Sequence, residues 1–389
     1  DDFEHGSTAA AYGGVTTVID MPCTSLPPVT SVKNLNEKLE ALKDRSLVDY
    51  VLWGGVRGDD FDNDINIQEQ ILELSEAGVA AFKAYLISGM TEFKDLTHEQ
   101  MKLAMKYVSQ TGKLLGVHAE DKLLVSSRRK TLKDKGINTW QAYCIARDIE
   151  AEEKAIANLI FIAQGIDIKV HIVHLSSETG LQLVKKAKVQ GLYFSAETCP
   201  HYLYFTQDHF NDPKIKNYLK TAPPVKFEND RDALWNGLQN GDISFVTTDH
   251  AGCDPAEGKI SDNFWEVYGG IPGVEHRVPF LFSEGFLKGK LTLEQTIKLL
   301  STNAAAYFNL EKKGSLEVGK DADIVLINLW ESEKILAKNM HSKGKYTPFE
   351  GIIFNTKVER TYLRGNVIAD KESTSEDRIG YGEFIPVKI

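Results

Sequence analysis

The stretch Ile168-Lys-Val-His-Ile-Val-His174 is a short run of apolar and β-branched residues that ends on a histidine. A segment with helical periodicity, Glu178–Val189, follows it, and a second short apolar run, Gly191–Ala196, comes next. Strands that alternate with helices pair in parallel, and near-continuous apolar runs are buried on both faces. The stretch therefore predicts a parallel sheet that is covered by helices.

The same alternation extends over most of the chain. The runs that read as strands are Val15–Met21, Val48–Trp53, Val79–Leu86, Leu114–His118, Ile168–His174, Gly191–Ala196 and Ser244–Asp249. Segments with helical periodicity between them include Val32–Lys43, Ile67–Ala77, Glu99–Thr111 and Ala151–Gln164. The pattern predicts an α/β protein of the (β/α)8 TIM barrel type, although that barrel needs eight strands and seven are visible here.

The start of the chain bears on the missing strand. Residues Phe3–Ala11 read as a helix that runs into Gly13-Gly14, a helix stop. We expect that the first barrel strand precedes residue 1 and is missing from this chain. The alternative, an open doubly wound sheet, is less favoured, because Val15–Met21 leads into Pro22-Cys-Thr-Ser-Leu-Pro-Pro28 and not into a glycine-rich phosphate turn.

The pattern changes after about residue 310. Lys313–Ile327 and Val358–Ile368 read as short strands that are separated by turns. We therefore expect two parts, a barrel over residues 1–310 and a C-terminal part over residues 311–389. The second part is expected to be a small β-sandwich appendage with a polar tail.

Composition limits the possible partners and the compartment. The 389 residues carry a formal net charge of −10 and no basic cluster, which argues against nucleic acid or an anionic membrane as partner. No segment approaches the roughly 18 consecutive apolar residues that span a bilayer. The four cysteines are widely separated and form no CxxC pair, which is typical of reduced thiols in a cytoplasmic protein.

Four ionisable residues lie within or at the ends of the predicted strands, namely Lys83, His118, His174 and Asp249. An ionisable group in an apolar strand is costly unless something compensates it. Active sites of this barrel lie at the carboxyl ends of the strands, so the four residues are expected to converge. Two imidazoles and a carboxylate are ordinary ligands of a divalent metal such as zinc. Burial favours the neutral lysine amine, which can capture carbon dioxide to form a carbamate and so become a ligand.

Each residue alone also has an ordinary structural interpretation. Either histidine could be a hydrogen-bonded core residue, Lys83 could pair with a carboxylate, and Asp249 could cap the segment that follows it. His171 is expected behind the barrel wall, because alternation along the strand separates it from His174. The joint pattern on the alternating strands favours the metal site.

Several longer stretches support a resemblance to a known family. They are Gly6-Ser-Thr-Ala-Ala-Ala-Tyr-Gly-Gly-Val-Thr-Thr-Val-Ile-Asp-Met-Pro22, Ala81-Phe-Lys-Ala-Tyr85, Gly116-Val-His-Ala-Glu120, Val173-His-Leu-Ser-Ser177, Glu197-Thr-Cys-Pro-His-Tyr202, Thr221-Ala-Pro-Pro224, Thr248-Asp-His250 and Gly314–Val325. In this order the chain resembles the cyclic amidohydrolases, the group that contains allantoinases, dihydroorotases and dihydropyrimidinases (hydantoinases).

The resemblance implies a (β/α)8 barrel with a β-sandwich appendage and a centre of two divalent ions, expected to be zinc. In such a centre carbamylated Lys83 bridges the ions, His118 and His174 hold one, and Asp249 holds the other and moves the proton during hydrolysis. The family also has a His-x-His pair on its first strand, and nothing in this chain matches it.

Individual positions separate the members of the group. Dihydroorotases that resemble this chain carry Asn where Cys23 stands, and hydantoinases carry Tyr where Ser88 stands. The stretches Leu26-Pro-Pro28 and Asn263-Phe-Trp265 to Gly269-Gly270 look most like allantoinases. Together with these differences they favour allantoinase, with dihydroorotase and hydantoinase as alternatives. The substrate is then a small cyclic ureide, with Ser88 beside it and backbone groups at Ala222 and Gly269 holding its ureido edge.

A different class of function is also compatible with the fold. Some proteins of this superfamily are catalytically silent scaffolds, but those tend to lose metal ligands, and this chain keeps every ligand that its length could contain. A homo-oligomer, a dimer or a tetramer, is expected from the resemblance.

Overall fold

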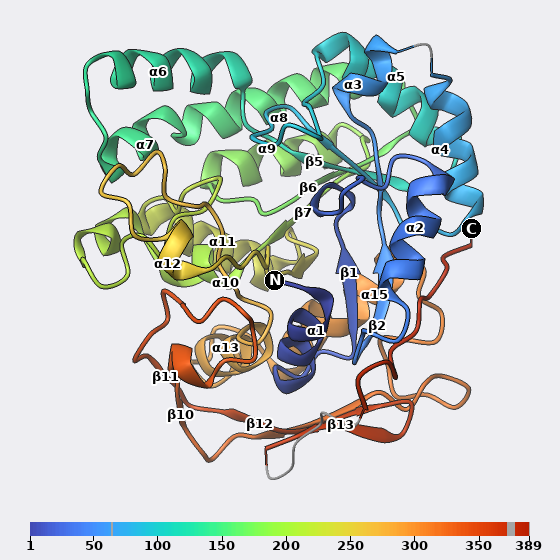
Figure 1. Ribbon diagram of the computed structural model, residues 1–389, viewed down its shortest axis with the longest axis vertical. Helices are drawn as coiled ribbons and strands as arrows, with labels where there is room; N and C mark the ends of the chain where they lie inside the picture. The colour runs from blue at the N-terminus through green and yellow to red at the C-terminus, as the bar shows by residue number, and fades with distance from the viewer. Residues whose placement is uncertain (64, 372–377, 389) are drawn as a thin grey trace.

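The computed structural model describes residues 1–63, 65–371 and 378–388, and in them seven parallel barrel strands form a curved wall (Figure 1). β1 pairs with β2, and β3 to β8 form a parallel sheet in sequence order. Only Trp53 separates β2 from β3, so the wall is continuous. The bounds are β1 Thr17–Asp20, β2 Asp49–Leu52, β3 Gly54–Gly55, β4 Phe82–Tyr85, β5 Leu114–His118, β6 Lys169–Ile172, β7 Phe194–Thr198 and β8 Phe245–Val246. The predicted α/β barrel is confirmed.

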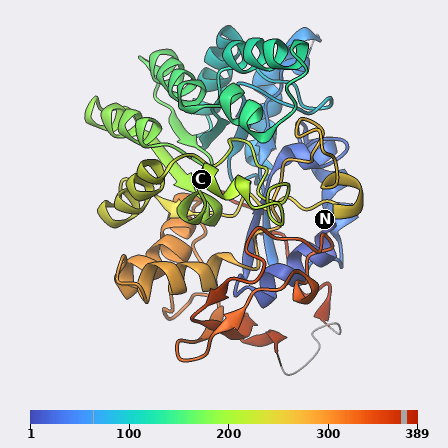
Figure 2. The same cartoon turned by 90° about the vertical axis from the view of Figure 1, so that its left-hand side faces the viewer.

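Helices surround the strands, as the two views at right angles show (Figures 1 and 2). Polar side chains at the helix starts cap free backbone N–H groups, for example Ser31, Thr97, Asp148 and Ser177. The α-helices are α1 Phe3–Tyr12, α2 Val32–Leu42, α3 Gly58–Asp62, α4 Ile67–Glu76, α5 His98–Ser109, α6 Lys122–Asp134, α7 Trp140–Ala146, α8 Ile149–Ala163, α9 Glu178–Val189, α10 Pro200–Tyr204, α11 Glu228–Asn240, α12 Pro255–Gly258, α13 Arg277–Phe280, α14 Leu293–Ile297 and α15 Asn303–Tyr307. None of the helices in the described residues is both long and apolar enough to cross a membrane.

The interior of the barrel is packed with side chains. One buried cluster contains Val51 of β2, Trp53 just after it, Leu114 of β5 and Phe245 of β8. Distant strands can share such a cluster because the wall curves around it. A Cβ atom at Gly116 would lie 2.4 Å from the Trp53 ring, so glycine is required there. This packing leaves the chemistry to the carboxyl ends of the strands.

The C-terminal segment, residues 378–388, lies against the opposite end of the barrel. Tyr50 N donates to Glu383 O at 2.9 Å, and Val387 N donates to Gly78 O at 2.9 Å. Lys113 Nζ donates to Val387 O at 2.9 Å. The described end of the tail is therefore part of the barrel closure.

The C-terminal appendage is an antiparallel sheet in the order β13–β12–β9, with a separate β10–β11 pair. Its strands are β9 Ile324–Asn328, β10 Glu333–Lys334, β11 Ile353–Phe354, β12 Lys357–Leu363 and β13 Asn366–Asp370. The sheet packs on α1, where Thr361 Oγ1 donates to Ala11 O at 2.7 Å. The predicted β appendage is confirmed, although the described residues form one three-stranded sheet and a short pair, not two full stacked sheets.

Candidate active site

The strand ends bring the four predicted metal-site residues to one end of the barrel. Lys83 lies on β4, and His118 is the last residue of β5. His174 follows the end of β6 by two residues, and Asp249 follows the end of β8 by three. Register places Tyr85 opposite His118, so β4 and β5 end at the same level. Lys83 influences the pKa of both histidines and of Asp249, so each of the three lies within electrostatic range of the lysine.

His118 and His174 form a close pair. His118 Nδ1 lies 3.0 Å from His174 Nε2, and the rings are 4.7 Å apart at 69°. Burial lowers the pKa of both rings, so both are neutral at pH 7. Neutral imidazole is the form that binds a metal.

Glu120 determines which nitrogen of His118 is available. His118 Nε2 donates to Glu120 Oε2 at 2.8 Å, and Arg147 forms a second, very short ion pair with the same oxygen. Burial alone raises the pKa of Glu120, but Arg147 and His118 outweigh it and lower that pKa to about 2. The carboxylate therefore holds the proton of His118 on Nε2 and turns the Nδ1 lone pair toward His174.

Lys83 is buried without a charged partner. Its Nζ lies 4.7 Å above the Tyr85 ring and makes no hydrogen bond or ion pair with any residue that the structure describes. Burial lowers the pKa of Lys83 to about 8, while Cys23, Asp249 and Glu197 oppose this shift. About a tenth of the amine is therefore neutral at pH 7, far more than for an ordinary lysine, and carbamate formation requires the neutral amine.

These donors can be tested against a metal ion. Two nitrogens on one tetrahedral zinc, each about 2.05 Å from it, lie about 3.3 Å apart, close to the separation in the histidine pair. No three His, Cys, Asp or Glu residues in the described ranges form a metal-binding group. A third ligand for the histidine pair would therefore come from Lys83 as its carbamate. The donor set fits one ion in this way, and of the predicted ligands only Asp249 remains for a second.

Asp249 combines a strained backbone with a perturbed carboxyl group. Its φ is +46°, and that of His174 is +44°, both in the left-handed region that residues other than glycine seldom adopt. Asp249 as a residue is exposed to solvent, but many protein atoms lie around its carboxyl group. Loss of solvation raises the pKa of Asp249 to about 6, with Lys83 and a hydrogen bond from Thr221 opposing the shift. Strain of this kind is concentrated at functional sites.

The predicted substrate residues lie on three loops. Ala222 follows Thr221, which contacts Asp249, and is half-buried. Gly269 is exposed beside Gly270, whose N–H donates to Lys220 O at 2.9 Å. Ser88 follows β4 and accepts a hydrogen bond from Met90 N at 3.1 Å, and it bonds to none of the other predicted residues in the described parts of the chain.

The structure adds residues that the sequence interpretation missed. The motif Gly116-Val-His-Ala-Glu120 contains Glu120, and its place two residues after His118 is the signal that could have identified it, since such residues point to the same face of a strand. Cys23 Sγ lies 3.0 Å from Tyr85 Oη, beside Lys83. The Cys23–Tyr85 contact joins segments far apart in the sequence, so spacing alone could not find it.

His171 is also placed differently from the prediction. His171 pairs in register with Gly116, so both residues face the same side of the sheet. A Cβ atom at Gly116 would point at the Trp53 ring inside the barrel, so His171 also faces the interior. Its Nδ1 lies 2.8 Å from Ser195 Oγ and its Nε2 lies 3.2 Å from Glu197 Oε2. The prediction that His171 lies behind the wall is therefore wrong, because His174 lies beyond the regular strand and simple alternation does not apply to it.

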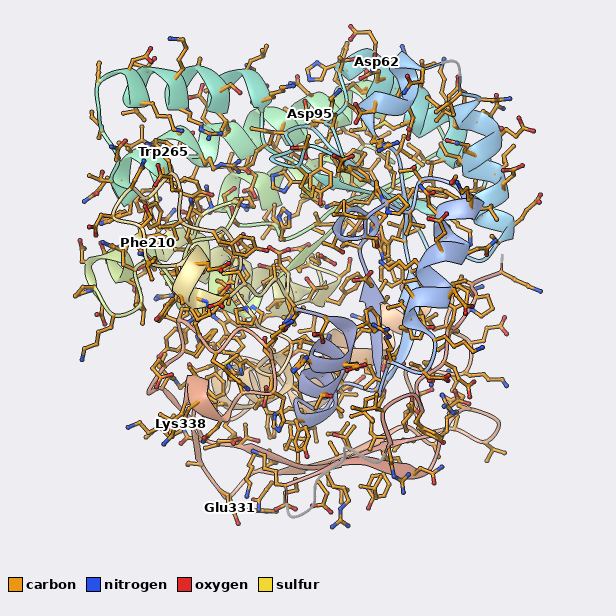
Figure 3. All side chains as sticks on the ribbon, viewed as in Figure 1. Asp62, Asp95, Phe210, Trp265, Glu331 and Lys338 are labelled. Carbon is orange, nitrogen blue, oxygen red and sulfur yellow. The ribbon has the colours of Figure 1, made fainter. Side chains whose placement is uncertain are left out.

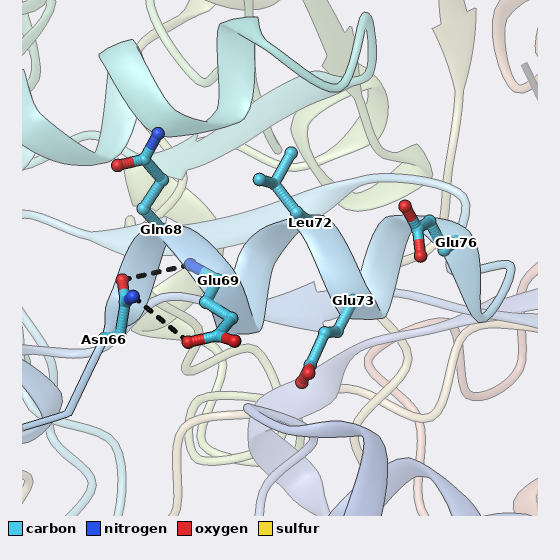
Figure 4. A pocket seen from close by; sticks show the side chains of 6 residues that line it. All are labelled: Asn66, Gln68, Glu69, Leu72, Glu73 and Glu76. Atoms are coloured by element: carbon cyan, nitrogen blue, oxygen red, sulfur yellow. Dashed lines mark hydrogen bonds between the residues drawn. The ribbon is translucent and has the colours of Figure 1, made fainter.

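A surface hollow of about 230 Å³ lies along α4, on the outside of the barrel (Figure 4). Its lining residues are Asn66, Gln68, Glu69, Leu72, Glu73 and Glu76. It contains no histidine, cysteine or lysine and lies on a different element from the four predicted metal-site residues. The hollow is a surface feature of one helix.

Comparison with known proteins agrees with this geometry. Residues 1–368 match the amidohydrolase family. The chain is 35% identical over 394 residues to the allantoinase of Bacillus licheniformis, covering 99% of this chain and 84% of that protein. It is 34% identical to the allantoinase of Enterococcus faecalis, covering 95% of this chain and 80% of that one.

Solved structures show the same architecture. The L-hydantoinase (dihydropyrimidinase) from Arthrobacter aurescens superposes with a TM-score of 0.92 at 29% identity, covering 99% of this chain and 84% of that one. The dihydropyrimidinase from Brevibacillus agri gives a TM-score of 0.92 at 26% identity, covering 100% and 84%. Amidohydrolases generally use divalent metal ions, as the paired imidazoles also indicate. The chain belongs to the amidohydrolase family and is a hydrolase.

Proposed function

We propose that the protein hydrolyses a ring carbon–nitrogen bond of a cyclic ureide, and that allantoin is its substrate. The observation that carries the proposal is the neutral histidine pair beside the buried, unpaired Lys83, in a chain 35% identical to an allantoinase over nearly its whole length. The hydantoinases of similar structure support a cyclic amide more generally.

The metal centre is the finer part of the proposal. His118 Nδ1, His174 Nε2 and the carbamate of Lys83 would hold one divalent ion, which we propose to be zinc, and Asp249 would contribute to a second. When bound, such ions make hydroxide available at neutral pH and polarise the carbonyl group. Glu120 keeps His118 in the tautomer that this role needs.

Asp249 is the proposed acid and base. With a pKa raised to about 6, its carboxylate can accept the proton of the attacking water and release it to the departing ring nitrogen near neutral pH. Ala222 and Gly269 offer backbone groups to the ureido edge, and Ser88 leaves a smaller, polar wall where hydantoinases have an aromatic one. An aryl-substituted ring would leave polar groups unpaired at that wall.

Two broader expectations complete the proposal. Residues 1–310 would carry the catalytic barrel, and residues 311–389 would support it. A cytoplasmic homo-oligomer, a dimer or a tetramer, is the proposed state of the enzyme.

The test is a side-by-side assay of the protein, loaded with zinc and bicarbonate, against allantoin, dihydroorotate, dihydrouracil and phenylhydantoin. We expect allantoin to be preferred over phenylhydantoin by at least about tenfold in kcat/KM. An Asp249→Asn variant with equal metal content serves as the inactive control. Preference for phenylhydantoin would favour the hydantoinase alternative, and absence of both bound metal and turnover would favour the scaffold.

A further inference from the structure

Two buried lysines connect the loops that carry Ala222 and Gly269. We call residues 217–223 the Ala222 segment and residues 259–271 the Gly269 loop. Lys220 of the Ala222 segment donates from Nζ to three carbonyl oxygens of the Gly269 loop, those of Phe264 at 2.6 Å, Trp265 at 3.3 Å and Val267 at 2.5 Å. Every hydrogen of this ammonium group can thus be used in binding the opposite loop.

Lys259 makes the reciprocal connection from the Gly269 loop. Its Nζ donates to Asn217 O of the Ala222 segment at 3.1 Å, and to Tyr268 O at 2.7 Å and Gly270 O at 3.0 Å of its own loop. Both lysines are almost fully buried, and neither forms an ion pair among the described residues. Burial lowers the pKa of both lysines to about 7, because carbonyl groups supply no counter-charge. The protonated amine nevertheless fixes the direction of each carbonyl group that it binds.

The orientation of these carbonyl groups has a consequence for Gly269. The Tyr268 carbonyl and the Gly269 N–H belong to one trans peptide, so they point in opposite directions. Because Lys259 binds the carbonyl, the N–H of Gly269 is directed away from this lysine. That N–H makes no hydrogen bond to any described residue, and neither the N–H nor the carbonyl of Ala222 makes one. Free donors and an acceptor therefore lie on the two connected loops.

The outer side of the Gly269 loop is held independently. Trp265 lies beside α7 (Figure 3), and its Nε1 donates to Ile137 O at 2.9 Å. Tyr346 Oη donates to Gly270 O at 2.9 Å from the C-terminal part. Loss of a lysine should therefore loosen the inner side of the loop without releasing the whole loop.

We infer that Lys220 and Lys259 are positioning residues, which together set the separation of the Ala222 segment and the Gly269 loop. At this separation the free backbone groups of Ala222 and Gly269 meet the alternating N–H and C=O groups of a ureide. This inference rests on the proposed function. The lysines contact neither the predicted metal ligands nor Ser88, so they act on substrate binding and not on the chemical step.

The experiment uses Lys220→Met, Lys259→Met and the double variant, with Lys113→Met as the matched control. Lys113 is also buried and donates to a carbonyl, but at the other end of the barrel. We expect KM for allantoin to rise about tenfold in each single variant while kcat changes less than about threefold. The double variant should be little worse than either single one, because the two lysines act as a unit.

Hydrogen exchange gives a readout that does not depend on turnover. Amides in residues 259–271 should exchange faster in both single variants and not in Lys113→Met. Folded variants with wild-type KM and wild-type exchange in this loop would overturn the inference. If the methionine variants do not fold, Lys220→Arg and Lys259→Arg, which keep a cation but cannot place it on the same three carbonyl groups, should raise KM about threefold, and an unchanged KM would overturn the inference equally.

The outcomes separate the inference from the proposed function. A wild-type protein that does not hydrolyse allantoin refutes the function, while the exchange measurement still tests whether the lysines hold the loop. Wild-type turnover with unaffected variants refutes the role of the lysines alone.

Discussion

Lys83 and Lys313 are both buried, at opposite ends of the barrel, and their surroundings differ completely. Lys313 Nζ lies 2.7 Å from Asp49, 2.8 Å from Asp323 and 2.9 Å from Asp321. Burial alone lowers its pKa, but the three carboxylates outweigh burial and raise it. Lys83 has no carboxylate partner among the residues that the structure describes, and burial lowers its pKa to about 8.

The difference shows what each end of the barrel does. The Lys313 cluster joins β2 to the segment before β9, and Arg364 adds a further very short ion pair with Asp49. Such a network holds the appendage on the barrel. A buried lysine without a charged partner adds no such stabilising contact, and its burial costs folding free energy. We therefore attribute its presence to chemistry at the carboxyl ends of the strands.

The largest effect should come from Lys83→Ala. We expect kcat/KM to fall by at least about a thousandfold, beyond the 10–100-fold typical of groups that only support a metal ligand. Stability should stay the same or rise, because an unpaired buried amine is removed. Steady-state kinetics, metal content and thermal unfolding measure this, with Lys113→Ala as the control that keeps activity. Activity within tenfold of wild type at full metal content would contradict the assigned role.

The opposite result is expected for Lys313→Met. This change leaves three carboxylates without their shared cation and should lower the free energy of unfolding by about 3–5 kcal/mol. The remaining folded enzyme should retain its kcat. Denaturant unfolding measures the effect, and Lys371→Met, which removes a partly exposed pair with Glu333, should cost at most about 1 kcal/mol. An equal loss of unfolding free energy in Lys313→Met and Lys371→Met would show that the buried cluster stabilises the protein no more than a surface pair does.

The smallest of the three effects is expected for Glu120→Gln. The amide no longer requires the proton of His118 on Nε2, so metal affinity should fall about 10–100-fold. Competition with a chelator measures affinity without any assay of turnover. Glu275→Gln, which changes a carboxylate that bonds His341 at 2.8 Å, is the matched control and should bind metal normally. Unchanged affinity in Glu120→Gln would show that His118 is oriented by other contacts.

The sequence by itself determined the fold class and the order of its elements. Apolar runs separated by helical periodicity predict parallel strands, and each of the seven predicted runs overlaps an observed barrel strand, although β7 extends two residues past its run and β3 begins just after its run. Lys83 and His118 were found because an ionisable residue in an apolar run is visible locally. That signal depends on burial, which periodicity reports directly.

Only the tertiary structure decided how those residues are used. His174 and Asp249 have a left-handed backbone, so the direction of their side chains does not follow strand alternation. Alternation from His174 therefore placed His171 outside the wall, whereas it lies in the interior. The contact of Glu120 with Arg147 and the carbonyl partners of Lys220 and Lys259 join loops that lie far apart in the sequence. Such contacts depend on where separate strands end in space, and local periodicity carries no information about that distance.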